Sequence, residues 1–260
     1  MQTEQKLEER LITAELIANA ARKVVSPLFK SSNLSIDYKE ALSPIVTQAD
    51  RDSEKAMREI IESQHPNDTI VGEEFGVKNG DSGFSWILDP IDGTIAFSVG
   101  KPVFGTLIGL AYQNDLVLGV IEQPVLKERF IGHKGSATLN GKEIKASDKE
   151  ELKYCSLGLT APLRQEQIKE KMDSLMAQVH VTSYGGDCYN YALLASGHLD
   201  IVVEKGLALH DFAALVPLIE GAGGVITDWS GNSIDKNSNG EVLACANKVI
   251  HAKVSSVLFS

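Results

Sequence analysis

The stretch that decides the fold is Trp86-Ile87-Leu88-Asp89-Pro90-Ile91-Asp92-Gly93-Thr94, in which an apolar run passes directly into two aspartates. Asp and Pro are disfavoured inside a strand, so the sequence predicts that a buried strand ends here. At such an end Asp89 and Asp92 can point into one crevice, and Gly93 lets the backbone approach a ligand closely. Gly93 and Thr94 are expected to open a helix whose free N–H groups suit a phosphate.

Further carboxylates stand where other apolar elements begin or end. Asp50 is expected at the start of a helix, Glu73 follows an apolar strand, and Asp211 is expected at the head of a helix over residues 211–222. Each one alone is ordinary, because an aspartate at a helix start is usually a cap. If all five carboxylates converge, their repulsion requires cations, and hard oxygen ligands select Mg²⁺ together with substrate phosphates.

The rest of the chain divides into two parts. Apolar residues at steps of three and four first predict two helices, over about 7–25 and 49–63, with Pro27 ending the first. Short apolar runs and the hairpin signal Asn140-Gly141 then predict a largely antiparallel sheet. Its expected strands lie at 69–72, 85–88, 104–112, 116–123 and 129–133.

Beyond about residue 150, strands and helices alternate, which is typical of an α/β layer. The expected strands lie at 179–183, 199–204, near 225 and at 242–246, and the expected helices at 165–178, 187–196, 211–222 and from 248. We therefore expect an N-terminal region over 1–147, with helices and a mainly antiparallel sheet, and a C-terminal α/β region over 148–260.

Composition argues against several classes of function. The 260 residues carry 25 Lys and Arg against 35 Asp and Glu, a formal charge of −10, and no basic cluster offers a footprint for nucleic acid. No apolar run approaches the roughly 18 residues of a membrane span, and the N-terminus lacks the apolar core of a signal peptide. We expect no nucleic-acid or membrane partner, a cytoplasmic location and, because the histidines lack H-x-x-x-H spacing, no zinc hydrolase.

Three ordered motifs resemble the inositol monophosphatase family of metal-dependent phosphatases. They are Asp89-Pro90-Ile91-Asp92-Gly93-Thr94, Gly72-Glu73-Glu74, and the distal run from Asp211-Phe212-Ala213-Ala214 to Glu220-Gly221-Ala222-Gly223-Gly224. Within the family the chain is similar to the histidinol-phosphate phosphatase branch, through Tyr184-Gly185-Gly186-Asp187-Cys188-Tyr189. The resemblance implies an α/β (α+β) fold, a layered α-β-α-β-α sandwich of the inositol monophosphatase and fructose bisphosphatase type, and a homodimer.

The same resemblance implies a role for each motif residue. Two or three Mg²⁺ ions would be held by Glu73, Asp89, Asp92, Asp211 and the backbone carbonyl of Ile91. These ions would clamp the attacking water and the leaving ester oxygen in line. Thr94 and Asp50, with Glu73, would activate the water, and the N–H groups of Gly93 and Thr94 would hold the phosphate.

The organic half of the substrate should meet Asp187 and Glu204. L-Histidinol phosphate carries an amine and an imidazole, for which a carboxylate is a suitable partner, whereas an inositol ring would donate its hydroxyls to the same groups. The alternatives are a helix N-cap for Asp187 and a solvated strand end for Glu204. Two residues near the expected site depart from the family pattern: His210 replaces an aromatic residue, and Ile95 stands where the branch has a basic or polar one.

The sequence thus predicts a Mg²⁺-dependent phosphomonoesterase acting on L-histidinol phosphate. Inositol 1-monophosphate, phosphoadenosine phosphate and sugar phosphates are alternative small phosphate esters. A non-catalytic protein that binds a phosphorylated ligand is the alternative of a different class. The complete set of motif residues argues against it, because a binder does not need both metals and water activation.

Overall fold

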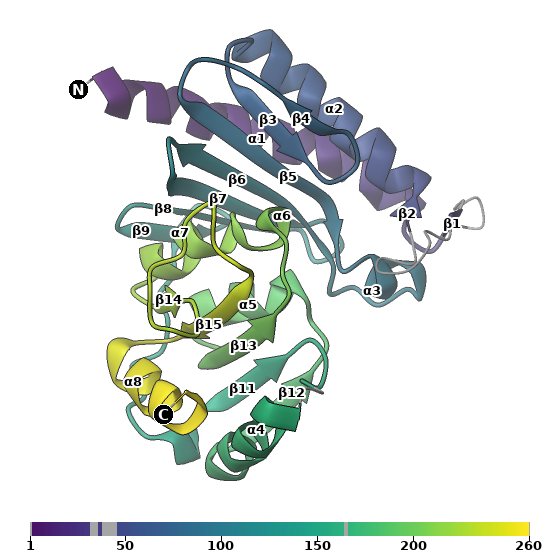
Figure 1. The fold of residues 1–260 in the computed structure, drawn as a ribbon. Helices are drawn as coiled ribbons and strands as arrows, with labels where there is room; N and C mark the ends of the chain where they lie inside the picture. Colours follow the sequence, from purple (N-terminus) through teal and green to yellow (C-terminus); the bar gives the residue numbers. More distant parts are fainter. Residues whose placement is uncertain (1, 32–35, 38–45, 164–165, 260) are drawn as a thin grey trace.

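The computed structural model of the chain describes residues 2–31, 36–37, 46–163 and 166–259. Its layers alternate between helices and sheets (Figure 1): a pair of helices, a large sheet, a middle layer of short helices, a second sheet, and an outer pair of helices. The expected α-β-α-β-α sandwich is therefore confirmed. The N-terminus lies on the side of the large sheet, and the C-terminus lies beside the second sheet.

The first helical layer forms as its periodicity predicts. It consists of α1 (Gln2–Leu28) and α2 (Gln48–Gln64). Ala14, Ile17, Ala18 and Ala21 of α1 are fully buried and pack on the large sheet. Pro27 lies within the last turn of α1, which ends one residue later. A two-stranded ladder, β1 (Ile36–Asp37) with β2 (Val46–Thr47), precedes α2.

The large sheet is eight-stranded in the described part of the chain, with the order β10-β9-β8-β7-β6-β5-β3-β4. All its pairs are antiparallel except β3 with β5, which confirms the expected largely antiparallel sheet. The strands are β3 (Thr69–Gly72), β4 (Gly76–Lys78), β5 (Phe84–Asp92), β6 (Gly105–Tyr112), β7 (Asp115–Gln123), β8 (Glu128–His133), β9 (Ser136–Leu139) and β10 (Lys142–Glu143). The short helix α3 (Thr94–Ser98) follows β5.

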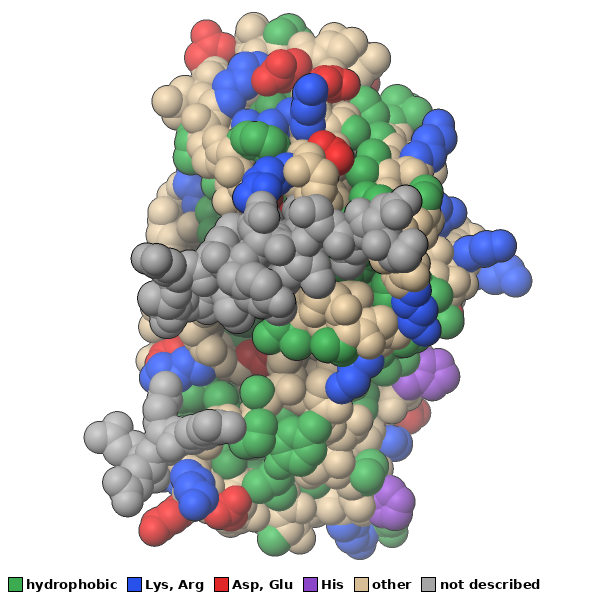
Figure 2. All heavy atoms as spheres, turned by 90° about the vertical axis from the view of Figure 1, so that its right-hand side faces the viewer, with side chains coloured by type: hydrophobic (Ala, Val, Ile, Leu, Met, Phe, Trp, Pro, Cys, Tyr) green, Lys and Arg blue, Asp and Glu red, His purple; other side chains and the backbone are tan. Residues whose placement is uncertain are grey.

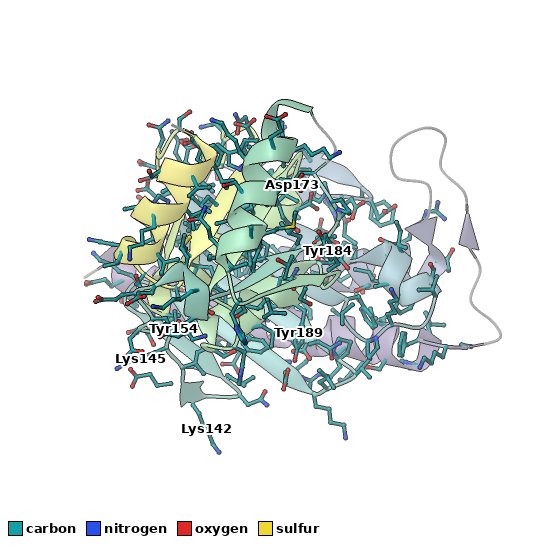
Figure 3. All side chains as sticks on the ribbon, turned by 90° about the horizontal axis from the view of Figure 1, so that it is seen from below. Lys142, Lys145, Tyr154, Asp173, Tyr184 and Tyr189 are labelled. Atoms are coloured by element: carbon teal, nitrogen blue, oxygen red, sulfur yellow. The ribbon has the colours of Figure 1, made fainter. Side chains whose placement is uncertain are left out.

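The second sheet is mixed, with the order β12-β11-β13-β15-β14. Its strands are β11 (Ser156–Leu159), β12 (Val181–Tyr184), β13 (Ile201–Lys205), β14 (Val225–Thr227) and β15 (Glu241–Cys245). The helical segments of this half are η1 (Leu152–Tyr154), α4 (Glu166–Gln178), α5 (Cys188–Ala195), α6 (Leu209–Phe212), α7 (Leu215–Gly221) and α8 (Lys248–Leu258). Helices α4 and α8 lie side by side on its outer face (Figure 3). The expected boundary between residues 147 and 148 lies in the segment that joins the two sheets, and the division into two regions stays a prediction.

One long helix over residues 211–222 was expected, and this prediction is wrong. Two short helices, α6 and α7, replace it, and Ala213 and Ala214 lie at their junction. A row of paired glycines explains the position of this junction. Gly109, Gly119 and Gly132 are neighbours across β6, β7 and β8.

The glycine row lets the middle helical layer press directly on the large sheet. A Cβ atom at Gly109 would lie 2.8 Å from the Cβ of Ala213, and one at Gly119 would lie 1.9 Å from the carbonyl oxygen of Ala214. A Cβ at Gly132 would come within 2.1 Å of the backbone of Leu218. Any larger residue in this row would push α6 and α7 away from the sheet. The close approach brings Asp211, on α6, to the end of β5.

Among the described residues, none of the helices combines the length and the apolar character that a bilayer crossing requires.

Candidate active site

Three aspartates from the two halves of the chain meet at one point. Asp89 and Asp92 come from the end of β5, and Asp211 comes from α6. Each offers a carboxylate oxygen, and these oxygens lie within 4.8 Å of one another. Asp89 is buried, whereas the other two are half-buried and accessible from the cavity described below.

The irregular end of β5 aims two of these aspartates at the same point. The pairing of β5 with β6 shifts register between Asp89 and Asp92, where Pro90 has no N–H to donate. The strand continues through both aspartates and ends at Asp92, four residues beyond the expected bound at 88. Two hydrogen bonds hold this segment: the N–H of Ile91 donates to Oδ1 of Asp89 over 3.0 Å, and the hydroxyl of Thr106 donates to the carbonyl of Pro90 over 2.7 Å.

The electrostatics of Asp89 show that two further carboxylates face the same point. Burial raises the pKa of Asp89 well above its usual value, and the negative charges of Glu73, Asp92, Asp211 and Asp50 raise it further. Asp50 lies in the first turn of α2 and is 1% exposed. Glu73 and Asp50 therefore lie near enough to raise the pKa of Asp89, whereas convergence of all five carboxylates on one metal centre stays a prediction.

Asp92 joins the two halves of the molecule. Its Oδ2 accepts a hydrogen bond of 2.6 Å from the N–H of Cys188, the first residue of α5. Burial, Asp187 and Asp211 raise the pKa of Asp92, and the bond from Cys188 opposes them. The thiol of Cys188 is buried beside this carboxylate, and burial and Asp92 raise its pKa well above the usual range, so it is an inert thiol.

Asp211 is both a helix cap and a member of the cluster. Its Oδ2 accepts a hydrogen bond of 2.6 Å from the N–H of Ala208, at the start of α6. Burial raises the pKa of Asp211, whereas His210, whose Nε2 lies 3.5 Å from Oδ1, opposes the shift. The sequence departure at His210 thus places an imidazole beside the carboxylate of Asp211.

Glu54 supports the segment that carries Glu73, and sequence analysis missed it. It is fully buried, and its carboxylate accepts hydrogen bonds from the N–H groups of Glu74 (2.7 Å) and Phe75 (3.2 Å). A Cβ at Gly72 would lie only 1.9 Å from Oε1 of Glu54. A charged residue on the buried face of an amphipathic helix is the signal that could have identified it.

The donor set fits a hard divalent cation. The converging ligands are carboxylate oxygens, which prefer Mg²⁺ or a similar ion over soft metals. Burial first, and then repulsion among the neighbouring carboxylates, raise the pKa values of Asp89 and Asp92. A bound cation would remove that repulsion.

The segment after Asp92 opens a short helix, and its expected role as a phosphate cradle stays a prediction. Gly93 has φ 83° and caps α3, a helix of five residues. The helix is too short for a large dipole, so the donors themselves, the N–H groups of Gly93 and Thr94, matter more. The hydroxyl of Thr94 donates to the carbonyl of Ile91 over 3.1 Å, and its expected pairing with Asp50 stays a prediction.

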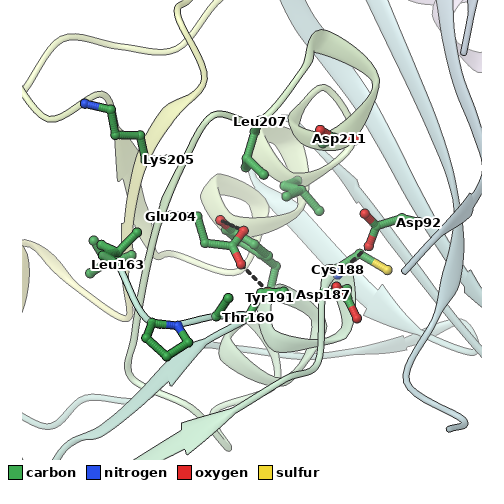
Figure 4. A pocket seen from close by; sticks show the side chains of 14 residues that line it. Asp92, Thr160, Leu163, Asp187, Cys188, Tyr191, Glu204, Lys205, Leu207 and Asp211 are labelled. Carbon is green, nitrogen blue, oxygen red and sulfur yellow. Dashed lines mark hydrogen bonds between the residues drawn. The ribbon is translucent and has the colours of Figure 1, made fainter. Parts of the chain in front are cut away.

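A cavity of about 520 Å³ opens beside the acidic centre, between α5, β13 and α6. Figure 4 shows Glu204 on one side of it, with Asp92, Asp187 and Asp211 on the other. Leu163, Leu207 and Leu215 also line it, so its walls are partly apolar. One ligand can therefore place a phosphate at the acidic centre and an organic group in the cavity.

Asp187 does not behave as an N-cap. It precedes α5, yet its side chain makes no capping hydrogen bond, and its φ of 45° and ψ of −134° are strained for a residue other than glycine. A Cβ at Gly93 would lie 2.9 Å from Oδ2 of Asp187, so Gly93 makes room for this carboxylate. Burial raises its pKa, and Lys101 opposes the shift.

Glu204 is not a solvated strand end. It is 8% exposed, and Thr160 and Tyr191 donate hydroxyl hydrogen bonds to its two oxygens. Burial raises its pKa to about 7, Thr160 and Tyr191 oppose the shift, and Asp187 and Asp211 add to it. Sequence analysis assigned no role to Thr160 or to Tyr191, although Tyr191 begins the run that follows Tyr184-Gly185-Gly186-Asp187-Cys188-Tyr189.

The departure at Ile95 lies at the surface. Ile95 of α3 is 61% exposed, and Val99, the residue after this helix, is 65% exposed. Figure 2 shows the side of the molecule on which α3 lies, with hydrophobic side chains gathered over its lower half and basic side chains scattered. This exposed position places the side chain of Ile95 at the surface and not in the acidic centre.

Comparisons with known proteins agree with this geometry. The model of the inositol monophosphatase family matches residues 6–258. A bifunctional phosphatase of Arabidopsis thaliana, IMPL2, chloroplastic, is 42% identical over 97% of this chain and 73% of its own length. A histidinol-phosphatase of Chlorobaculum parvum is 33% identical over 90% of each chain. The solved structure of an inositol monophosphatase from Zymomonas mobilis has a TM-score of 0.87 and 41% identity, covering 96% of this chain and 98% of that one.

Proposed function

The chain belongs to the inositol monophosphatase family and is a metal-dependent phosphatase, and on this premise we propose that it hydrolyses L-histidinol phosphate with Mg²⁺. The observation that carries the proposal is the pair of carboxylates, Asp187 and Glu204, on the cavity that also contains Asp92 and Asp211. An amine or imidazolium on the organic half of the ester would find a charged acceptor there. The name of the Chlorobaculum parvum relative supports the same substrate.

We assign the metal ligands as the family resemblance implies them. They are Glu73, Asp89, Asp92, Asp211 and the carbonyl of Ile91. Two or three bound Mg²⁺ ions would supply the positive charge that attracts the phosphate and makes water a better nucleophile at neutral pH. Because the ligands come from β5, from the turn after β3 and from α6, the geometry of the centre depends on the packing of both halves.

The remaining residues bind and orient. The N–H groups of Gly93 and Thr94 hold phosphate oxygens, and the hydroxyl of Thr94, with Asp50 and Glu73, orients the attacking water. Asp187 lies against Gly93, so it reaches the part of the ester next to the phosphate. Glu204 lies across the cavity from Asp92 and Asp187 and receives the far end of the organic group (Figure 4).

A second substrate is favoured by a specific finding. The Zymomonas mobilis structure, 41% identical to this chain, is that of an inositol monophosphatase. Asp187 and Glu204 would then accept hydrogen bonds from ring hydroxyls instead of cationic nitrogens. Neutral hydroxyl donors gain less from a carboxylate than cations do, which makes the two substrates distinguishable by their response to charge removal.

The experiment that tests the proposal is phosphate release from a panel of esters with Mg²⁺. Histidinol phosphate, inositol 1-monophosphate, phosphoadenosine phosphate and fructose bisphosphate would be compared by kcat/KM. The proposal expects histidinol phosphate to rank first. A higher kcat/KM for inositol 1-monophosphate would move the assignment to that ester, and phosphate release from none of them would favour a ligand-binding protein.

We also propose a homodimer and a cytoplasmic location, as the family resemblance and the sequence implied. The three cysteines are buried free thiols, which suits a reducing compartment. Light scattering coupled to size-exclusion chromatography would measure the mass of the assembly. A monomer at working concentrations would contradict the first proposal, and an export-dependent disulfide would contradict the second.

A further inference from the structure

The carboxylate of Glu204 accepts hydrogen bonds from two hydroxyl groups, whose residues line the same cavity. The hydroxyl of Tyr191, a fully buried residue of α5, donates to Oε2 over 3.0 Å. The hydroxyl of Thr160, the residue after β11, donates to Oε1. Each oxygen of Glu204 thus accepts one hydrogen bond, from two elements other than its own strand, β13.

These two bonds leave the carboxylate with acceptor capacity on its cavity side. A carboxylate has about four lone-pair positions, and the two hydroxyls use two of them. Both donors are neutral, so they orient the group without cancelling its charge. The adjacent Lys205 is paired with Glu241 over 2.7 Å, and Figure 4 shows its side chain directed away from Glu204.

The arrangement also reduces the cost of binding. A glutamate side chain has three rotatable bonds, and fixing a free one in a single rotamer costs conformational entropy. Tyr191 and Thr160 fix Glu204 before any ligand arrives, because Tyr191 is rigid in the packed core of the middle layer. The negative charge is presented in one direction, toward the cavity shared with Asp187.

We propose that Tyr191 and Thr160 are positioning residues that hold the Glu204 carboxylate toward the cavity for a cationic nitrogen in the organic half of the substrate. The inference rests on the proposed function for the identity of that nitrogen. The two hydrogen bonds from Tyr191 and Thr160 to Glu204 form whichever ester is bound. Neither residue touches the reacting phosphate, so the pair acts on substrate binding and leaves the chemical step to the metal centre.

The test separates KM from kcat in variants that remove only the hydroxyl. Tyr191→Phe and Thr160→Val should each raise the KM for histidinol phosphate about tenfold, as expected for a weakened charge-assisted contact, with kcat changed less than about twofold. Thr160→Ser, which keeps the hydroxyl, should restore a KM near that of the parent protein.

Tyr189→Phe is the matched control. Tyr189 lies on the same helix, and its hydroxyl donates to Glu128 over 2.7 Å, away from the cavity. Tyr189→Phe removes a tyrosine–glutamate hydrogen bond of the same kind and should leave the KM for histidinol phosphate unchanged. If Tyr189→Phe raised KM as much as Tyr191→Phe, the effect would be general loosening of α5, and the proposal would be overturned.

A double-mutant cycle with Glu204→Gln gives the decisive comparison. If Tyr191 acts through Glu204, Tyr191→Phe should raise KM much less in the Glu204→Gln background than in the parent. Additive effects would overturn the proposal. Should the parent release no phosphate from histidinol phosphate, the proposed substrate fails, and the same cycle is then measured with the ester that is hydrolysed. Coupling between the two substitutions with that ester would support the positioning role of Tyr191. Additive effects would overturn this role independently of the substrate assignment.

Discussion

The two halves of the molecule hold their acidic side chains in different ways. In the N-terminal half, backbone groups fix the carboxylates: the N–H of Ile91 holds Asp89, and those of Glu74 and Phe75 hold Glu54. In the C-terminal half, a backbone N–H also holds Asp211, the member of the acidic centre, whereas on the cavity side-chain hydroxyls hold Glu204, and Asp187 has a strained backbone and no capping bond. Asp92, from the first half, is fixed by a backbone N–H of the second.

The acidic centre, where the phosphate would react, thus depends on backbone donors, whereas the cavity, where the organic group would bind, depends on side-chain donors. A backbone donor remains when the side chain of its own residue is replaced, so these hydrogen bonds of the acidic centre do not depend on side-chain identity at the donor residues. Hydroxyl donors disappear with a single substitution, such as Tyr191→Phe. A fold built in this way can exchange its organic substrate while it retains the same phosphate chemistry, which is why assignment of the family is easier than assignment of the ester.

Removal of divalent cations should have the largest effect on turnover. It should act on the acidic centre and leave the fold intact. Turnover of every ester is expected to vanish in EDTA and to return with Mg²⁺, because clustered carboxylates repel a phosphate dianion. Phosphate release and circular dichroism would be measured on the same samples. Undiminished turnover in EDTA with an intact fold would contradict metal catalysis.

Asp92→Asn should lower kcat for all accepted esters by about 100- to 1,000-fold, the cost of losing a principal electrostatic contact in the transition state. The Asn side chain still accepts the bond from Cys188, so the fold should survive. Asp115→Asn, at an exposed position of β7, is the control. A loss confined to one ester would show that Asp92 belongs to recognition and would break the division between the halves.

Asp187→Asn should act on one class of ester. The KM for histidinol phosphate should rise about ten- to a hundredfold, since a charge-assisted hydrogen bond contributes roughly 1.5 to 3 kcal/mol, while the KM for inositol phosphate should change little. Asp173→Asn, on α4 of the same half (Figure 3), is the control. Equal changes in KM for the two esters would mean that the charge of Asp187 does not interact with a cationic group of the substrate.

The pH dependence of KM should be the smallest effect. Burial raises the pKa of Glu204 to about 7, so its carboxyl is neutral below this pH and negatively charged above it. The KM for a cationic ester should therefore fall several-fold between about pH 6 and about pH 8, while the ammonium group of the ester stays protonated. Glu204→Gln should flatten this profile. A parallel profile for inositol phosphate would assign the titration to another group.

Local patterns predicted the elements that depend on local physics. The periodicity of residues 49–63 places α2 within one residue at each end, and the run from Trp86 to Thr94 identifies the acidic strand. The break between α6 and α7 could not be predicted, because it depends on contact with glycines about a hundred positions earlier. The roles of Glu54 and Tyr191 escaped for the same reason: each acts through a partner distant in sequence or in another element.

The 2.6 Å bond between Asp92 and the N–H of Cys188 spans 96 positions of the chain. A chain that is being synthesised or refolded can form the large sheet, β3 to β10, before the second half docks. Its acidic centre stays incomplete until α5 and α6 pack against that sheet. The rise of phosphatase activity therefore reports the docking of α5 and α6. Trp86 lies in the core of the first sheet and Trp229 packs on Phe259 beside the second, so fluorescence of single-tryptophan variants would time each half. Activity should lag behind both signals, and Mg²⁺, by binding only the docked state, should draw the docking equilibrium toward completion.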